Sequence, residues 1–513
     1  MNQRTSPGMM WTIRKGFWNW LAKFKYRGNK PAHFPVPVDD PQRIGTVPLS
    51  SVTPAIPINN IMVADRVPSD EAQPLKKLFY GFQLLMYRLL PAMQPGLPQV
   101  DADPFAALHV AYTPGHRQLF PPPVRPPELD GSDDALLAAI AVQGPFACYV
   151  ERASDGGFQW DLREIGNHEH YQGLHRLGVH VSFEVDPAAH ALRPHRIESV
   201  LGVHQPNDAD WSLAVRLALC TANTHVSLVR HFCWVHLAAG AALAIATRNC
   251  LPAAHPMRRL LWPHMFGTQY SNAIVTDGQM VPGGDFPDTF SLTHQGMCSL
   301  FSASYPKYRL SVIDPSADAA HRGIVDAGFD TPSQDNLQAL FDVMHTHARR
   351  YVDAYYPSDK AIADDASVMA WLDALERTIP NGLHELVAKP VTPAGLARLI
   401  GGFIYMASVQ HEVLGQGVWN YQLWTDRIPV RLYRDGRREP IDVYQRLINA
   451  NFNLNVHRAK LMQDFSDLGL DRRAQELFTL FLRDLQLLDD ALKLQPQTAW
   501  LMRPSMLDAN INA

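Results

Sequence analysis

Apolar residues recur at three- and four-residue spacing over much of this 513-residue chain. Such spacing is typical of helices with one buried face. It predicts helices over residues 70–93, 211–224, 334–356, 361–378, 391–414 and 471–492. Residues 147–150 and 179–183 alternate apolar and polar positions instead, which predicts short half-buried strands. The pattern therefore predicts a mainly α protein with a few short β-strands.

The most apolar stretch begins at His231 and reads HFCWVHLAAGAALAIATRNC. A helix without a polar face predicts burial on all sides. His231 and His236 are five residues apart, so on a regular α-helix they point about 140° apart. A π-bulge widens a turn and brings such a pair toward one face, and π-bulges occur mostly at functional sites. The pair therefore predicts either a metal site on a distorted helix or two core histidines with ordinary hydrogen-bond partners.

A second histidine cluster follows this helix. After H-x4-H come His255-Pro256, Leu260-Leu261 and Pro263-His264, and this combination resembles the signature of the lipoxygenases. The resemblance extends over roughly residues 100–513. It is carried further by the segments Val124–Leu129, Val142–Phe146, Tyr355–Asp359, Phe403–His411 and Arg503–Ser505.

The resemblance implies a large lipoxygenase-like helical catalytic domain around a long buried metal-binding helix. His231, His236 and His411 would bind a non-haem metal, and the terminal carboxylate of Ala513 would be a further ligand. His255 and His264 would support the site. Three imidazoles with a carboxylate suit iron, with manganese as the alternative.

Three positions depart from the family pattern, and a fourth, Arg427, has a candidate counterpart in some relatives. Gly415 stands four residues after His411, where the family has Asn or His, so we expect a water there, with Gln416 close enough to compensate. The chain ends in Ala513 where isoleucine is usual. Val275 replaces the Ala or Gly that stands eleven residues after His264, which would narrow the oxygen pocket. Arg427 lies near the position where some relatives hold the substrate carboxylate.

The function that the resemblance implies is insertion of O2 into the 1,4-pentadiene unit of a polyunsaturated fatty acid, giving a lipid hydroperoxide. The departures keep two alternatives open. One is an enzyme of the same fold that acts on hydroperoxides or on a polyene secondary metabolite. The other is a metal-poor lipid-binding protein, which three buried imidazoles argue against because burying unpaired polar groups costs free energy.

The chain divides by composition into three parts. Residues 1–60 form a basic leader and a Pro-rich linker, residues 61–99 an N-terminal helical segment, and residues 100–513 the catalytic domain. We expect no N-terminal β-barrel lipid-binding domain, as in shorter bacterial relatives. Residues 10–26 place apolar side chains on one side of a helix and Lys or Asn on the other, which predicts either contact with a membrane surface or packing on the protein itself.

Composition limits the partners and the compartment. The net charge of −4 gives no reason to expect nucleic acid. The five cysteines are scattered, which predicts reduced thiols and a cytoplasmic location. No uninterrupted apolar run reaches the length of about 18 residues that a membrane-spanning helix needs. The remaining paired histidines, at 168–170 and 345–347, lie among polar residues and are expected to be solvated.

Overall fold

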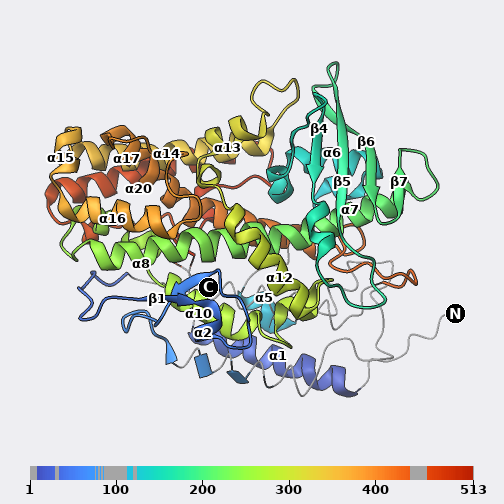
Figure 1. Cartoon of the computed structure of the whole chain (residues 1–513), viewed down its shortest axis with the longest axis horizontal. Helices are drawn as coiled ribbons and strands as arrows, with labels where there is room; N and C mark the ends of the chain where they lie inside the picture. Colours follow the sequence, from blue (N-terminus) through green and yellow to red (C-terminus); the bar gives the residue numbers. More distant parts are fainter. Residues whose placement is uncertain are drawn as a thin grey trace.

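A long composite helix runs through the middle of the computed structural model, which describes residues 9–28, 34–74, 77–78, 81–82, 85, 113–119, 124–438 and 459–511. It joins α7 (Trp211–His225), the π-helical segment η4 (Val226–Gly240) and α8 (Ala241–Cys250) (Figure 1). By length and composition alone it could cross a membrane, but 94% of its most apolar window is buried inside the protein. The predicted buried central helix is confirmed.

Four long helices and one short one form a layer beside this central helix, on the left of Figure 1. They are α14 (Pro332–Tyr355), α15 (Asp359–Ala363), α16 (Ala366–Thr378), α17 (Pro393–Tyr405) and α20 (Arg472–Lys493). The helices predicted from the apolar spacing agree with these bounds, with one interruption inside 361–378. There Asp365 caps α16 by accepting hydrogen bonds from the amides of Ser367 and Val368.

A five-stranded antiparallel sheet covers the other end of the central helix. Its order is β3 (Glu151–Arg152), β4 (Phe158–Asp161), β5 (Val179–Asp186), β6 (Ala191–Ser199) and β7 (Gly202–His204). Alternate residues of β5 are buried beneath α6 (Asp133–Val142) and α7. The predicted strand at 179–183 is confirmed. The strand predicted at 147–150 is wrong, because Gly144 (φ 74°) and Pro145 start a 3-10 helix over Gly144–Cys148.

Shorter elements connect these layers. The helical ones are α2 (Leu49–Val52), α5 (Pro114–Leu119), α9 (Pro256–Met265), α10 (Thr268–Ile274), α11 (Asp285–Thr289), α12 (His294–Ser304), α13 (Pro315–Arg322) and α18 (Val418–Gln422). Three further π-helical segments are η5 (Val275–Gln279), η8 (Met406–Gln410) and η9 (Val413–Gly417). The short antiparallel strands β1 (Thr46–Pro48) and β2 (Met62–Ala64) pair with each other.

The segment expected to be a linker packs against the core. Its Leu49, Ile56 and Ile58 are buried. Arg248 of α8 forms ion pairs with carboxylates at both ends of the segment, including Glu71 at 2.7 Å. Residues 34–74 are therefore tied to the central helix and are not a free linker. The predicted helix over 70–93 lies mostly outside the described residues, so the domain boundaries at residues 60 and 99 stay predictions.

Helix α1 (Met9–Gly28) packs on α5 through a buried strip that includes Trp18, Leu21 and Ala22. The side chain of Asn19 accepts a hydrogen bond from the amide of Gly115 at 2.9 Å. Packing on the protein itself, one of the two alternatives for residues 10–26, therefore accounts for one face of this helix.

The expectation of a solvated histidine at 347 is wrong. His347 of α14 is 1% exposed, and its ring stacks on Phe481 at 4.2 Å between centroids. Neither ring nitrogen has a hydrogen-bond partner among the described residues. Burial lowers the pKa of His347 to about 3, so the folded protein keeps this ring neutral.

This burial predicts acid sensitivity. Below the unfolded-state pKa of about 6.5 the unfolded chain takes up a proton at His347 that the folded chain does not, which costs about 1.4 kcal/mol of stability per pH unit. The contribution of the neutral His347 ring to the free energy of unfolding is therefore complete above pH ~6.5 and is lost as the pH falls toward 3. We expect His347→Phe to reduce the loss in denaturation temperature between pH 7.5 and pH 5.5. The exposed His384→Phe is the matched control and should respond like the parent. Equal losses in the parent and in His347→Phe would contradict this account.

Candidate metal centre

Three histidines from separate parts of the chain meet at the middle of the central helix. His231 and His236 lie in η4, and His411 lies between η8 and η9. One ring nitrogen of each lies within 4.8 Å of the others, and all three residues are buried. The widened turn predicted from the five-residue spacing is confirmed, because η4 is π-helical throughout and Ala241 N donates to His236 O, five residues back.

Two polar neighbours orient the rings. Asn272 Oδ1 lies 3.0 Å from His236 Nδ1, and Asn272 Nδ2 donates to the carbonyl oxygen of His236. Glu412 Oε1 lies 3.1 Å from His411 Nδ1. An amide oxygen and a carboxylate oxygen only accept, so each ring donates through Nδ1 and keeps a lone pair on Nε2. Fixing the tautomer in this way is the usual role of such partners behind a metal-binding histidine.

The two Nε2 atoms face one another at 3.2 Å. Two lone pairs at that distance repel unless a cation or a proton lies between them. Two imidazole nitrogens bound to one transition metal at ~2.0–2.1 Å are about 2.9–3.4 Å apart in octahedral or tetrahedral geometry. The measured distance and the donor chemistry therefore fit a metal ion held by these rings.

Gly415 lies against His231. A Cβ at this position would be 3.2 Å from His231 Cε1, so the residue faces the histidine cluster without supplying a ligand atom. The family that the sequence resembles has a side-chain ligand, Asn or His, at this position. The side chain of Gln416, the proposed compensating residue, lies outside the described residues.

The C-terminal tail reaches the same region. Ile511 is buried against Gly240 of η4, where a Cβ would collide with its Cδ1 atom. The carbonyl oxygen of Ala509 accepts hydrogen bonds from His264 Nδ1 and Ser408 Oγ, both at 2.8 Å. His264 is therefore hydrogen-bonded to the C-terminal tail. The terminal carboxylate of Ala513 lies outside the described residues.

Two expected site residues lie elsewhere. His255 caps α9 by accepting from the amide of Met257, and its Nε2 lies 3.1 Å from Asp365, so it has no contact with the three histidines. Arg427 pairs with Asp133 at 3.1 Å and does not line the cavity beside the histidines. The expectation that Arg427 binds a substrate carboxylate in that cavity is therefore wrong, because its charge is already matched by this carboxylate near the surface.

A largely apolar cavity lies beside His231 and His236. Val275 of η5 and Gly415 lie in the cavity wall. The sequence predicts a pocket position for Val275. The aromatic residues of the wall are Phe232, Phe286, Phe290 and Trp419. Such a lining excludes water and suits an apolar chain, while Ser227 and Gln422, hydrogen-bonded at 2.7 Å, form a polar spot.

Sequence reasoning missed Asn272 and Glu412. Glu412 carries a usable signal, because an acidic residue directly after a buried histidine in an apolar helix requires a partner. Asn272 carries none, since it stands 36 residues from His236 on another helix and only the tertiary fold brings them together.

The fold and this cluster define a helical protein with a histidine-rich candidate metal site on its core helix. The family model for lipoxygenases matches residues 186–451, slightly more than half of the chain. The chain belongs to the lipoxygenase family. This confirms the family that the sequence motifs resemble, and the family binds non-haem iron.

Individual relatives are more distant. The chain is 27% identical over 229 residues to polyunsaturated fatty acid lipoxygenase ALOX15 of Mus musculus, covering 43% of this chain and 33% of the relative. It is 24% identical over 230 residues to hydroperoxide isomerase ALOXE3 of Homo sapiens, covering 44% and 32%. The matches thus span about a third of these relatives. The crystal structure of coral 8R-lipoxygenase is similar in fold, with a TM-score of 0.75 and 13% identity over 99% of this chain and 82% of that one.

The three-histidine cluster predicts a specific loss. We expect His236→Ala to abolish metal retention, measured by elemental analysis after dialysis, because the remaining groups hold the ion poorly with Gly415 unable to coordinate. His255→Asn is the matched control: asparagine can still cap α9, and the residue has no contact with the cluster, so metal content should equal that of the parent. Full metal occupancy in His236→Ala would show that the ligand set is wrong.

Proposed function

We propose that the chain is a non-haem metal dioxygenase that inserts O2 into the 1,4-pentadiene unit of a polyunsaturated fatty acid and releases a lipid hydroperoxide. The observation that carries the proposal is the convergence of His231, His236 and His411 beside an aromatic-walled cavity. Family membership supports dioxygenase chemistry in general. The substrate and the reaction on it are our proposal.

The side chains divide the work. When bound, iron supplies the one-electron chemistry that removal of a doubly allylic hydrogen atom requires; manganese is the alternative. Asn272 and Glu412 hold two imidazoles with Nε2 turned inward. Phe286 and Trp419 exclude water and align an acyl chain, and Val275 narrows the space at one end of the diene.

The remaining ligand positions follow from the same proposal. The carboxylate of Ala513 completes the protein ligands, since the tail is already buried up to Ile511 beside the site. A water occupies the position that Gly415 leaves open, with Gln416 next to it. We place the enzyme in the cytoplasm, with residues 100–513 as its catalytic domain.

A different reaction on the same fold is the second candidate. Gly415 and Val275 both lie in the cavity wall and both depart from the family pattern, so they favour an enzyme that acts on hydroperoxides or on a polyene metabolite. A metal-poor lipid-binding protein is the third candidate. The inward-facing lone pairs at 3.2 Å count against it, because they repel unless a cation or a shared proton lies between them.

The test combines metal analysis with oxygen uptake on the full chain, carrying no C-terminal tag. We expect near-stoichiometric iron or manganese, oxygen consumption with linoleic and arachidonic acids, and conjugated-diene absorbance in the product. Metal without oxygen uptake would overturn the dioxygenase proposal in favour of hydroperoxide or polyene chemistry, which product analysis with fatty acid hydroperoxides then checks. Failure to take up metal on reconstitution would leave only the lipid-binding candidate.

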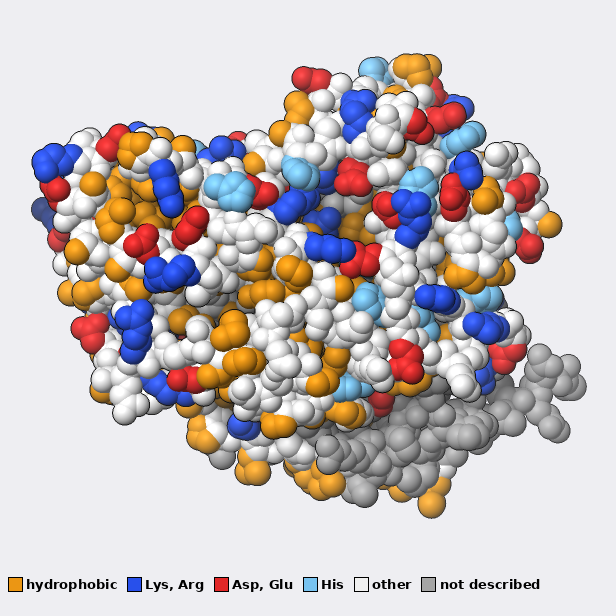
Figure 2. All heavy atoms as spheres, viewed as in Figure 1, with side chains coloured by type: hydrophobic (Ala, Val, Ile, Leu, Met, Phe, Trp, Pro, Cys, Tyr) orange, Lys and Arg blue, Asp and Glu red, His pale blue; other side chains and the backbone are white. Residues whose placement is uncertain are grey.

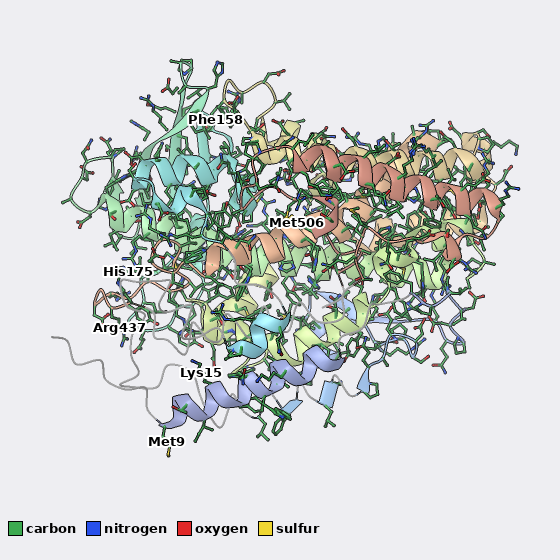
Figure 3. All side chains as sticks on the ribbon, turned by 180° about the vertical axis from the view of Figure 1, so that it is seen from behind. Met9, Lys15, Phe158, His175, Arg437 and Met506 are labelled. Carbon is green, nitrogen blue, oxygen red and sulfur yellow. The ribbon has the colours of Figure 1, made fainter. Side chains whose placement is uncertain are left out.

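We also propose that α1 contacts an anionic membrane surface. Met9, Ile13 and Trp20 are 75%, 48% and 51% exposed at helical spacing on one face of α1. Leu78, Phe82 and Leu85 form a second exposed apolar row, and Phe82 lies 5.6 Å from Phe17 of α1. Figure 3 shows α1 along the edge of the molecule, and Figure 2 shows hydrophobic side chains along that edge.

Charge favours an anionic surface as the partner. The first thirty residues carry seven Lys or Arg and no acidic residue. An apolar face with a tryptophan, flanked by cations, is typical of helices that lie in the interface of an anionic bilayer. Packing of Trp18 and Leu21 on the protein holds the other face of α1 in place.

Vesicle co-sedimentation tests this surface. We expect the full chain to bind vesicles that contain phosphatidylglycerol more strongly than vesicles of phosphatidylcholine alone, and added salt to weaken the binding. Ile13→Ser with Trp20→Ser should reduce binding several-fold. The control replaces two equally exposed valines near β7, Val200→Ser with Val203→Ser, and should bind like the parent. Equal binding by both double variants would contradict the proposal.

A further inference from the structure

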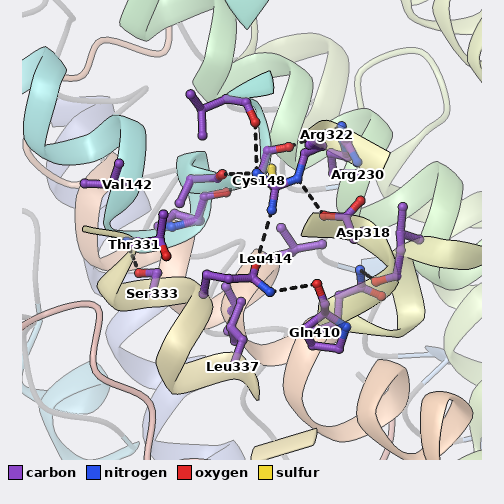
Figure 4. A pocket seen from close by; sticks show the side chains of 18 of the residues that line it. Val142, Cys148, Arg230, Asp318, Arg322, Thr331, Ser333, Leu337, Gln410 and Leu414 are labelled. Atoms are coloured by element: carbon purple, nitrogen blue, oxygen red, sulfur yellow. Dashed lines mark hydrogen bonds and ion pairs between the residues drawn. The ribbon is translucent and has the colours of Figure 1, made fainter. Parts of the chain in front are cut away.

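A second cavity, distinct from the one beside the histidines, is lined by residues 142–150 and 312–337 together with residues of η4, η8 and η9 (Figure 4). Arg230, the residue directly before His231, lines this second cavity, and Leu414 lines both cavities. Much of the remaining wall is apolar and comes from Val142, Pro145, Val150, Val312, Ile324 and Leu337.

Arg322 and Asp318 lie in the wall of this cavity together with Arg230. Arg322 donates through Nε to Asp318 Oδ2 at 2.8 Å, and its other nitrogens donate to backbone carbonyls and to Gln334 (Figure 4). Arg309 lies 3.8 Å from the other oxygen of Asp318. One carboxylate thus serves two guanidinium groups, and the cavity wall retains an excess of positive charge.

Arg230 lacks a direct ion pair with any described residue, although the carboxylates of Asp318 and Glu151 lie close enough to attract it. Among the described residues no carboxylate lies within 4.0 Å of it, its Nε is buried without a hydrogen-bond partner, and its one hydrogen bond, to Cys148 O, is 3.5 Å long. Its guanidinium lies 4.4 Å from the ring centroid of Trp234 and 5.4 Å from that of Tyr149. These two rings hold the cation in position without supplying a counter-charge.

Two arginines of the described residues show how such groups can be paired with carboxylates. Arg248 pairs with three, at 2.7–3.2 Å. Arg125 pairs with Asp130 and Asp426, both at 2.8 Å. Arg230 has no such direct pair in the described part of the chain, and its largely enclosed Nε leaves it able to bind an anion that enters the cavity.

We infer that this second cavity binds the carboxylate of an acyl-chain ligand, with Arg230 as the counter-charge and the apolar wall around the chain. A planar guanidinium binds a carboxylate through two parallel hydrogen bonds, and the apolar side chains beside it match an alkyl chain. The inference concerns binding and is independent of the proposed reaction. Two sources share this chemistry: a separate fatty acid confined to this cavity, or one molecule whose chain continues past Leu414 toward the histidines.

The test measures binding of laurate, a saturated fatty acid that cannot undergo pentadiene chemistry, to the full chain by calorimetry. We expect Arg230→Gln to weaken laurate binding at least tenfold and Arg230→Lys to weaken it less, since lysine keeps the charge but not the two-pronged geometry. Dodecanol, which has the same chain without the carboxylate, should bind the parent and Arg230→Gln equally. Arg349→Gln, at an exposed arginine of α14, is the matched control.

Equal laurate affinity in the parent and Arg230→Gln would overturn the inference. If Arg230→Gln does not fold, Leu337→Phe narrows the cavity and leaves the cation in place, and it should weaken laurate and dodecanol alike.

A laurate analogue with a photoreactive group at its chain end distinguishes the two sources. Labelling of 142–150 or 331–337 indicates a separate ligand, and labelling of 286–290 with loss of labelling in Arg230→Gln indicates one molecule across both cavities. Labelling at 286–290 that persists in Arg230→Gln would also overturn the inference.

Discussion

The side chains of His231, His236 and His411 converge inside the protein with ring nitrogens close together, and the geometry of the surrounding backbone depends on this convergence. A regular α-helix cannot bring His231 and His236 to one side, so η4 keeps the wider π-helical turn over 15 residues. Such helices are rare and poorly stable alone. This one persists because its side chains are almost all buried against neighbouring helical elements, among them α10, α12, η8 and η9. A second π-helical pair, η8 and η9, brackets His411 in the same way.

The ends of the chain are fastened to the same helix. Near the N-terminus, Glu71 pairs with Arg248 and also accepts hydrogen bonds from the amides of Gln269 and Tyr270, which links residues 34–74 to α8 and α10. At the C-terminus, Ile511 fits over Gly240, a position that no larger residue could occupy. The chain has alanine at position 513, where the family usually has isoleucine. The apolar packing of Ile511, two residues earlier, offsets this difference in part. Both ends stabilise a segment whose own backbone geometry is unfavourable.

The features that could be predicted from the sequence are those that depend on a repeating pattern or on neighbouring residues. The 3.6-residue period located α14, α16, α17 and α20, and the five-residue histidine spacing indicated the π-helical turn, because both depend on neighbours along the chain. Sequence reasoning misplaced the segment 147–150, where a positive φ at Gly144 overrides an alternating pattern. It misplaced Arg427 because counting along the chain cannot show that Asp133 already pairs with it. Asn272 and the packing of residues 34–74 depend on tertiary contacts and leave no trace in spacing.

Gly415 and its neighbours show how closely the two cavities are connected. A side chain at position 415 would press on His231, so the residue that departs from the family pattern is also one that cannot be enlarged without moving a candidate ligand. Leu414, one residue earlier, separates the two cavities. Arg230, one residue before His231, lines the second cavity. Single steps along the chain at 230–231 and 414–415 thus connect positions that line the second cavity with positions beside the histidine cluster.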